Sequence, residues 1–145
     1  MTRVLLVLLL IAAGCSDGDP EGLRLDDPWA RPSPSVATTA AFFVTIENSS
    51  DVGETLVRAT TDACRVTELH MSSMTDGVMR MQQMADGIEI PALTTVVLQP
   101  GGLHIMCIDK IADFAPDEEL TVDLEFRDGT GSSHTESMNA VVEDR

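Results

Sequence analysis

The fold class is decided by residues 120–127, which read Leu120-Thr121-Val122-Asp123-Leu124-Glu125-Phe126-Arg127. Apolar and polar side chains alternate through the whole stretch. Because successive side chains of a β-strand point to opposite faces, the apolar residues share one face and the polar or charged residues share the other. This period of two predicts a half-buried strand rather than a helix, whose apolar positions recur every three or four residues.

Strand signals continue in both directions from this stretch. Asp128-Gly129 predicts a turn into a last strand from His134 to Val142. Toward the N-terminus, similar signals predict strands at 40–46, 55–60, 65–70, 78–84, 88–90, 94–98 and 103–108. Residues 111–119 are expected to form one helical turn at most, broken at Pro116. Short strands without a long amphipathic helix predict an all-β, antiparallel β-sandwich or barrel.

The N-terminus has the pattern of an export signal. Arg3 precedes an unbroken apolar run at 4–13, which is much shorter than the ~20 residues that span a bilayer. The run ends in Ile11-Ala12-Ala13-Gly14-Cys15, which resembles a bacterial lipobox, although Ala12 stands where leucine is more usual. An ordinary signal peptide with an incidental cysteine is the alternative.

These signals predict three parts of the chain. They are a lipoprotein signal peptide at 1–14, a lipidated Cys15 with an Asp/Gly/Pro-rich tether at 15–25, and one β-domain at 26–145. Lipidation would anchor the domain to a membrane of the bacterial cell envelope, outside the cytoplasm. We expect the domain to be a monomer.

The charge of the chain excludes some partners. The formal net charge is −15 at pH 7, which argues against nucleic acid and against a polybasic membrane-binding patch. Aromatic residues make up only 3% of the chain, so base-stacking surfaces are not expected. Most of this negative charge is interpreted as a contribution to solubility.

Two cysteines remain after the lipobox cysteine, namely Cys64 and Cys107. An exported location permits a disulfide between them. Two buried free thiols, or Cys107 as an extra metal ligand beside Met106, are the alternatives that the sequence leaves open.

The candidate site residues are His70, Met81, His104 and Met106. His104 and Met106 are two residues apart on a predicted strand and therefore share a face. Thioether sulfur is a soft, neutral ligand and imidazole a borderline one, so a site of this composition suits Cu(I) far better than Mg, Ca or Mn. A methionine-rich packing or partner-binding surface is the alternative. His134 and Met138, on the last predicted strand, are expected to be surface residues.

The spacing of these residues resembles the periplasmic copper chaperone family called PCuAC. That family has a His, ten residues, a Met, about twenty-one residues and then His-x-Met. Here ten residues separate His70 from Met81, and twenty-two separate Met81 from His104. Further matches lie at 29–32, 41–48, 77–81, 89–92 and 100–104, so that the resemblance covers roughly 26–126. Departures are the cysteine pair and the absence of a Gly-rich turn at Leu93-Thr94.

The resemblance implies a cupredoxin-like, Ig-like Greek-key β-sandwich with an exposed Cu(I) site made by His70, Met81, His104 and Met106. It also implies delivery of copper toward the Cu-A centre of cytochrome c oxidase, with a thiol-containing assembly protein as a co-worker. Secondary sulfur contacts from Met71, Met74 and Met84 are a further expectation, with core packing as the rival reading. Core packing is favoured for Met79 and for Trp29.

Two other classes of function stay open at this point. A blue-copper electron carrier needs two His, one Cys and a weak axial Met, for which Cys107 beside Met106 is a candidate. A metal-free, Ig-like module could use the methionines to bind a partner protein. The chain has no nucleophile elbow, phosphate loop or zinc-protease motif, so we do not expect an enzyme.

Overall fold

The computed structural model describes residues 22–145, and the regular elements of this part are all β-strands. They are β1 (Leu23–Ala30), β2 (Thr39–Asn48), β3 (Glu54–Thr60), β4 (Cys64–Thr75), β5 (Val78–Gln83), β6 (Ile88–Ile90), β7 (Thr94–Leu98), β8 (Leu103–Lys110), β9 (Glu119–Asp128) and β10 (Ser133–Val142).

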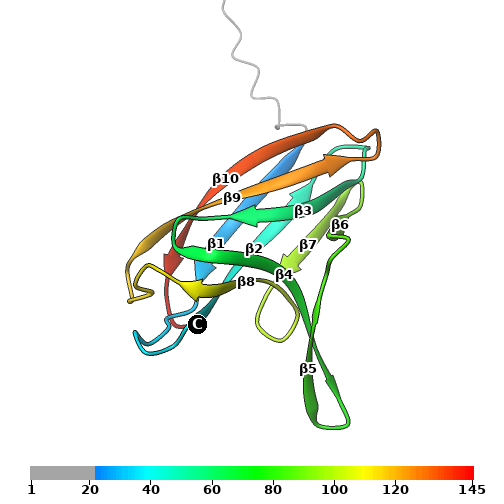
Figure 1. The fold of residues 1–145 in the computed structure, drawn as a ribbon. Coiled ribbons are helices and arrows are strands. Elements are labelled where there is room, and N and C mark those ends of the chain that lie inside the picture. Colours follow the sequence, from blue (N-terminus) through cyan, green and yellow to red (C-terminus); the bar gives the residue numbers. More distant parts are fainter. Residues whose placement is uncertain (1–21) are drawn as a thin grey trace, which may run out of the picture.

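The strands form one continuous sheet that folds over a shared core (Figure 1). The strand order is β5-β4-β8-β2-β1-β10-β9-β3-β6, and β7 pairs with β2 beside this path. The all-β, cupredoxin-like class is confirmed. One pair departs from the predicted antiparallel arrangement, because β1 runs parallel to β10 through Trp29↔Val141 and Ala30↔Val142.

The core lies between the two halves of the folded sheet. The alternating stretch that predicted β9 supplies Val122, Leu124 and Phe126, and all three are fully buried. Their largest fully buried partners from other elements are Phe42, Ile46, Leu56, Ile90, Leu98, Ile105 and Phe114. Burying each such side chain contributes about 1.5–3 kcal/mol, so this core holds the strands that carry the candidate site.

Two predicted strand boundaries and one predicted helical turn differ from the structure. Strand β1 begins at Leu23, inside the predicted tether, because Leu23 and Leu25 pack against the core. Strand β4 continues past His70 to Thr75, because β5 pairs with its second half. The helical turn expected in 111–119 is wrong, since this segment instead forms an isolated bridge between Phe114 and Ser33.

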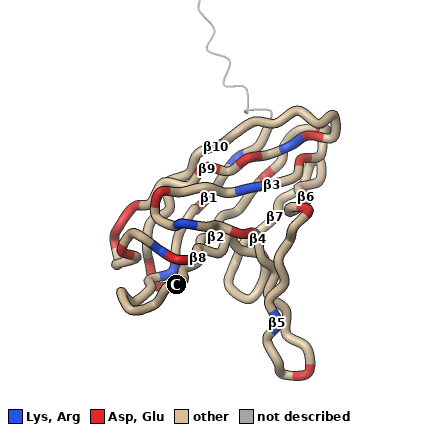
Figure 2. Tube along the Cα trace, viewed as in Figure 1, with Lys and Arg blue, Asp and Glu red and all other residues tan. Residues whose placement is uncertain are grey.

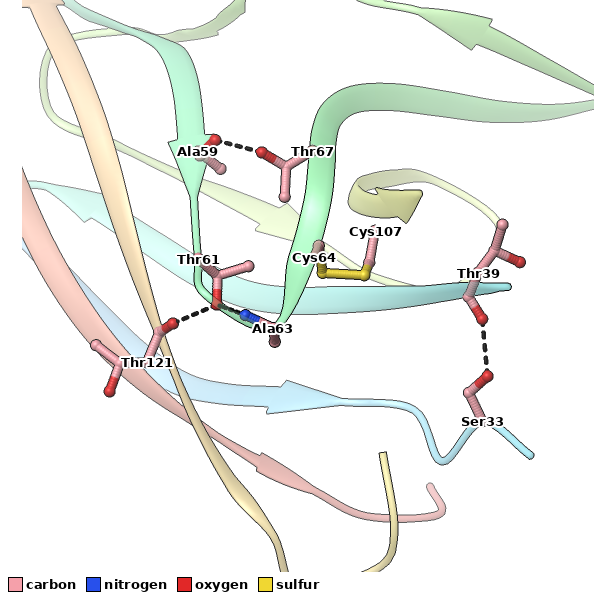
Figure 3. Close-up of a disulfide and its surroundings, with 9 residues drawn as sticks. All are labelled: Ser33, Thr39, Ala59, Thr61, Ala63, Cys64, Thr67, Cys107 and Thr121. Carbon is pink, nitrogen blue, oxygen red and sulfur yellow. Dashed lines mark hydrogen bonds between the residues drawn. A yellow bond between two sulfur atoms is a disulfide. The ribbon is translucent and has the colours of Figure 1, made fainter. Parts of the chain in front are cut away.

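A disulfide joins β4 to β8 on the core side of the sheet (Figure 3). The Cα atoms of Cys64 and Cys107 are 5.6 Å apart, within the usual range for a bridge. Near it, the hydroxyl of Thr67 on β4 donates to the carbonyl of Ala59 on β3. Strands β4 and β3 stand next to the two edges of the sheet, β5 and β6. The hydrogen bond between β4 and β3 brings the two ends of the sheet close together.

The second half of β4 and the whole of β5 project from the body as a hairpin (Figure 1). All six residues of β5 are exposed. The N-terminal end of β1 lies at the opposite end of the molecule from this hairpin. The domain therefore has two distinct ends.

The export-signal predictions lie largely outside the described residues. The signal peptide at 1–14, Cys15 and most of the tether precede Gly22. Across residues 22–145, we find no helix with the length and hydropathy required to cross a lipid bilayer.

Candidate metal centre

His70 and His104 lie directly opposite each other on the paired strands β4 and β8. Their ring centroids are 5.8 Å apart, with an interplanar angle of 73°. In the same register, Glu68 lies opposite Met106. Because paired residues share a face and residues two apart on a strand do so as well, these four side chains lie on one face of the sheet.

Strand β5 adds methionines to the same face. Met81 is opposite Ser72 and Met79 is opposite Met74, and both partners have the same strand parity as His70. His70 thus has His104 directly opposite and Met106 and Met81 as diagonal neighbours on either side. We call this the His/Met face, and its His, Met and Glu members are Glu68, His70, Met74, Met79, Met81, His104 and Met106. Ser72 and Gln83, which is opposite His70 on β5, share the same face.

Exposure rises across the His/Met face from the body to the hairpin. His104 is 5% exposed, whereas the side chain of His70 is 14% exposed and Met81 is 51% exposed. Met106 is partly buried. A largely buried histidine pair therefore adjoins an exposed thioether on the projecting hairpin.

One ring nitrogen of each histidine lies within hydrogen-bond distance of an oxygen atom. The Nδ1 atom of His104 is 3.0 Å from the backbone carbonyl of Gly102. The Nε2 atom of His70 is 2.8 Å from Oε2 of Glu68. The Nδ1 atom of His70 is buried and has no hydrogen-bond partner. Hydrogen bonds of this kind are typical of the partners that orient metal-binding imidazoles.

An aromatic row supports His104 on the side away from the hairpin. Phe43 on β2 is buried, and its ring centroid is 6.4 Å from that of His104. The Trp29 ring packs against Phe43 in a tilted arrangement, with a centroid distance of 4.4 Å, and the guanidinium of Arg145 lies 5.2 Å from the centre of the Trp29 ring. The row excludes water from one side of His104, while its other side faces His70.

The C-terminal Arg145 that covers Trp29 is itself anchored to β1. It forms two hydrogen bonds to the carboxylate of Asp27. These hydrogen bonds lower the pKa of Asp27, with the charge of Arg145 acting in the same direction. The end of the chain is thus tied to the strand that carries Trp29.

The structure does not bring Met71 and Met84 to the His/Met face. Met71 has the opposite strand parity to His70 and lies opposite Leu103 on β8. Met71, Met84 and Leu103 line a shallow pocket on the other face, and Met84 and Leu103 pack against the core. Of the expected secondary contacts, only Met74 shares the face of His70.

Two of three other side chains differ from their predicted environments. Met79 was expected in the core but is 59% exposed on the hairpin. Met138 was expected at the surface but is buried in the core, because β10 turns every second residue of its last half inward. His134 is exposed, as expected, and its ring stacks beside Phe126.

Cys107 is directed away from the candidate ligands. It follows Met106 on β8, so it points to the core face, where it is fully buried and bonded to Cys64. A sulfur in a disulfide has no free thiolate to bind a metal. Cys107 is therefore unavailable as the thiolate ligand that a blue-copper site would need.

Sequence reasoning missed Glu68 and Phe43 as parts of the site. Glu68 lies two residues before His70, so its place on the same face could have been read from strand parity. Phe43 could not have been found this way, because its contact with His104 depends on the pairing of β2 with β8.

Charge is sparse on the hairpin that carries Met81 (Figure 2). Asp76 at its tip and Arg80 on β5 are the charged residues between Met71 and Gln83. The His/Met face therefore offers neutral nitrogen and sulfur donors, with Glu68 as its one carboxylate. Fold and site together define a cupredoxin-like β-domain with a soft-ligand face that continues onto an exposed hairpin.

The chain belongs to the LpqE-like family, described as "Putative lipoprotein LpqE-like", whose model matches residues 23–135. It is similar to "Putative lipoprotein Lxx21020" from Leifsonia xyli subsp. xyli, with 31% identity over 112 residues that cover 77% of this chain and 66% of the relative. The chain spans less than two thirds of the length of the curated relatives that it matches.

Solved PCuAC-type proteins have the same fold. A copper-bound PCuAC domain from PmoF2 gives a TM-score of 0.66 at 22% identity, covering 85% of this chain and 93% of that domain. The solution structure of CuI-DR1885 from Deinococcus radiodurans gives a TM-score of 0.63 at 22% identity, covering 88% of this chain and 81% of that protein. At these identities the comparison establishes the fold.

Proposed function

We propose that this protein is an extracytoplasmic chaperone that binds one Cu(I) through His70, Met81, His104 and Met106. The observation that carries the proposal is the strand register that places these four side chains on one face of β5, β4 and β8. Two imidazoles and two thioethers form a neutral, soft donor set that suits Cu(I). The copper-bound state of PCuAC domains with this fold supports the same reading.

The graded exposure of the donors supports transfer rather than permanent storage. His104 is buried and backed by Phe43, so it gives the site a fixed base. Met81 is half exposed on the projecting hairpin, where an incoming ligand could replace it first. Copper would then leave by stepwise ligand exchange, which keeps the metal bound throughout.

The proposed recipient is the Cu-A centre of cytochrome c oxidase, reached directly or through a thiol-containing assembly protein. Cysteine thiolates bind Cu(I) more strongly than thioethers because they carry charge, so transfer toward them is favourable. The family and the relative from Leifsonia are described as lipoproteins, which supports lipidation at Cys15 and a place at the surface of a membrane.

A competition titration of the domain (residues 16–145) with Cu(I) and a colorimetric chelator tests the binding site. The wild type is expected to take one Cu(I) from the chelator, and the His70→Ala/His104→Ala double variant is expected to take none. His134→Ala is the matched control, because it removes the remaining histidine, which lies on β10. A wild type that cannot compete would leave a metal-free, partner-binding module as the better description.

Transfer is tested by mixing the Cu(I)-loaded domain with a soluble, reduced, metal-free Cu-A domain. Copper is expected to move to the acceptor, as measured in both proteins after separation. Retention of copper by the loaded domain would contradict this recipient and leave the copper-binding proposal intact. A thiol-containing assembly protein would be the next acceptor to test.

A further inference from the structure

The two histidines of the His/Met face are held by different ring nitrogens. His104 uses Nδ1, which lies 3.0 Å from the carbonyl of Gly102. His70 uses Nε2, which lies 2.8 Å from the carboxylate of Glu68. A backbone carbonyl and an ionised carboxylate can only accept hydrogen bonds, so each of these nitrogens must carry the proton.

A neutral imidazole carries one N–H, and the other nitrogen keeps a free lone pair. In His104 the free nitrogen is therefore Nε2. In His70 it is Nδ1. A metal binds the unprotonated nitrogen, so these hydrogen bonds determine which atom of each ring is available to copper.

The Nδ1 atom of His70 provides an independent observation. It is buried, and no donor in the described part of the chain satisfies it. An unpaired polar atom in a buried position is costly, and such atoms often mark the place of a missing ion or a functional contact. The ring of His70 faces that of His104, with their centroids 5.8 Å apart. A nitrogen lone pair without a hydrogen-bond donor is expected on this ring if Nδ1 binds a metal that is absent from the metal-free protein.

We propose that Glu68 is a positioning residue that holds His70 with its proton on Nε2, so that Nδ1 of His70 and Nε2 of His104 are the nitrogens offered to Cu(I). This inference rests on the proposed function for its metal. Glu68 lies opposite Met106 and is itself partly buried, with a side chain that is 30% exposed. The carboxylate orients the ring and raises its basicity without entering the metal's own set of ligands.

A rival role for Glu68 predicts the opposite change in Cu(I) affinity when its carboxylate is removed. If copper bound Nε2 of His70, Glu68 would occupy the metal-binding nitrogen in the metal-free protein and would have to be displaced. Removing the carboxylate would then strengthen copper binding. A positioning role predicts that the same change weakens it.

The experiment compares the wild type with Glu68→Ala, Glu68→Gln and the control Glu89→Ala. The control removes an equal charge from β6, at an exposed position. The first measurement is the ¹⁵N NMR spectrum of the imidazole rings in the metal-free proteins, at a pH where histidine is neutral. The second is Cu(I) affinity by chelator competition, with a thermal unfolding curve to verify the fold.

In the wild type, His70 is expected to show a protonated Nε2 and an unprotonated Nδ1. Glu68→Ala is expected to mix the two tautomers of His70 and to weaken Cu(I) binding by about 10–100-fold. The carbonyl of Gln in Glu68→Gln can still accept the hydrogen bond, so this variant should keep the tautomer and most of the affinity. Glu89→Ala should match the wild type.

An unchanged His70 tautomer in Glu68→Ala, or an unchanged or higher Cu(I) affinity, would overturn the proposal. The NMR measurement needs no metal. If the wild type took up no Cu(I), the proposed function would fail, and the spectra would still decide whether Glu68 sets the tautomer of His70.

Discussion

His70 occupies the centre of the candidate site. It faces His104 across β4 and β8, and it has a methionine on each diagonal. Diagonal neighbours in a sheet are about 7–8 Å apart, within reach of long side chains. Each methionine has three rotatable bonds and adapts to its partner, so the two thioethers can close on a metal that the histidines hold first.

Met106→Leu tests the contribution of one thioether. The substitution conserves volume, so the free energy of unfolding should change by less than about 1.5 kcal/mol. Cu(I) affinity should fall at least about tenfold, which corresponds to ~1.4 kcal/mol, because the sulfur donor is lost. Chelator competition measures the affinity, and urea unfolding measures the stability.

Met79→Leu is the matched control for this variant. Met79 lies on the same face, near the tip of the hairpin, and is not among the four proposed ligands. Its replacement should leave Cu(I) affinity unchanged. Equal losses in the two variants would show that the methionines act as a nonspecific cluster.

The shared face of His104 and Met106 could be predicted from sequence, because strand parity is a local property. Glu68 was within reach of the same reasoning. Phe43 and Trp29 were not recognisable as the support of His104, because their row depends on pairing across β1, β2 and β8. Met71 and Met84 fall on the other face because β4 continues as a regular strand through residues that were expected to form a loop.

The β4–β5 hairpin is the part of the domain that projects beyond the sheet around the core. Strand β5 pairs only with β4 among the described strands, and all its side chains are exposed. Few buried contacts therefore hold it, and such segments open at a much lower free energy than the core. Composition alone could not predict this, because a methionine-rich segment also suits core packing.

Hydrogen exchange of the metal-free domain should resolve this difference. Amides of β5 are expected to exchange much faster than those of β2 and β8, which lie inside the sheet. Adding Cu(I) should slow exchange in β5, because Met81 would tie the hairpin to the histidines. Equal protection of β5 and β8 without copper would contradict this description.

The disulfide is expected to stabilise the pairing of β4 with β8 from the core face, opposite the His/Met face. It links β4 to β8 and closes a loop between residues 43 positions apart. Replacing both Cys64 and Cys107 with alanine should lower the free energy of unfolding by about 2–4 kcal/mol. Urea unfolding of the oxidised wild type and of the double variant measures the difference.

Copper binding distinguishes this structural role from a direct one. The cysteines lie on the core face and the proposed ligands on the other, so the folded double variant should still bind one Cu(I). Loss of copper binding in a variant that remains folded would require the cysteines to take part in the site. The blue absorption band of a Cu(II)–thiolate site is not expected in either protein.

At the scale of the whole molecule, we propose that one sequence feature sets its location in the cell envelope. Cys15 in its lipobox-like context is expected to carry lipid. Cys15→Ser should move the protein from the membrane fraction to the soluble fraction of the cell envelope, while the purified domain keeps its Cu(I) affinity. Mass spectrometry of the wild-type N-terminus checks the lipid directly, and an unchanged distribution would argue for ordinary signal cleavage.

The overall architecture was largely predictable, and its exceptions have physical reasons. Alternation along 120–127 identified a sandwich strand, and it forms as expected in β9. The parallel pairing of β1 with β10 could not be read from local pattern, because it joins the two ends of the described domain. The true start of β1 was hidden by polar residues around Leu23 and Leu25, which make a weak apolar signal.

The start of the described domain, at the N-terminal end of β1, and the β4–β5 hairpin lie at opposite ends of the molecule (Figure 1). If Cys15 carries lipid, as we propose, the molecule is held at one end and its hairpin lies at the other. For such an anchored protein we expect a copper-accepting partner whose metal site stands out from the membrane surface rather than lying level with the lipid headgroups.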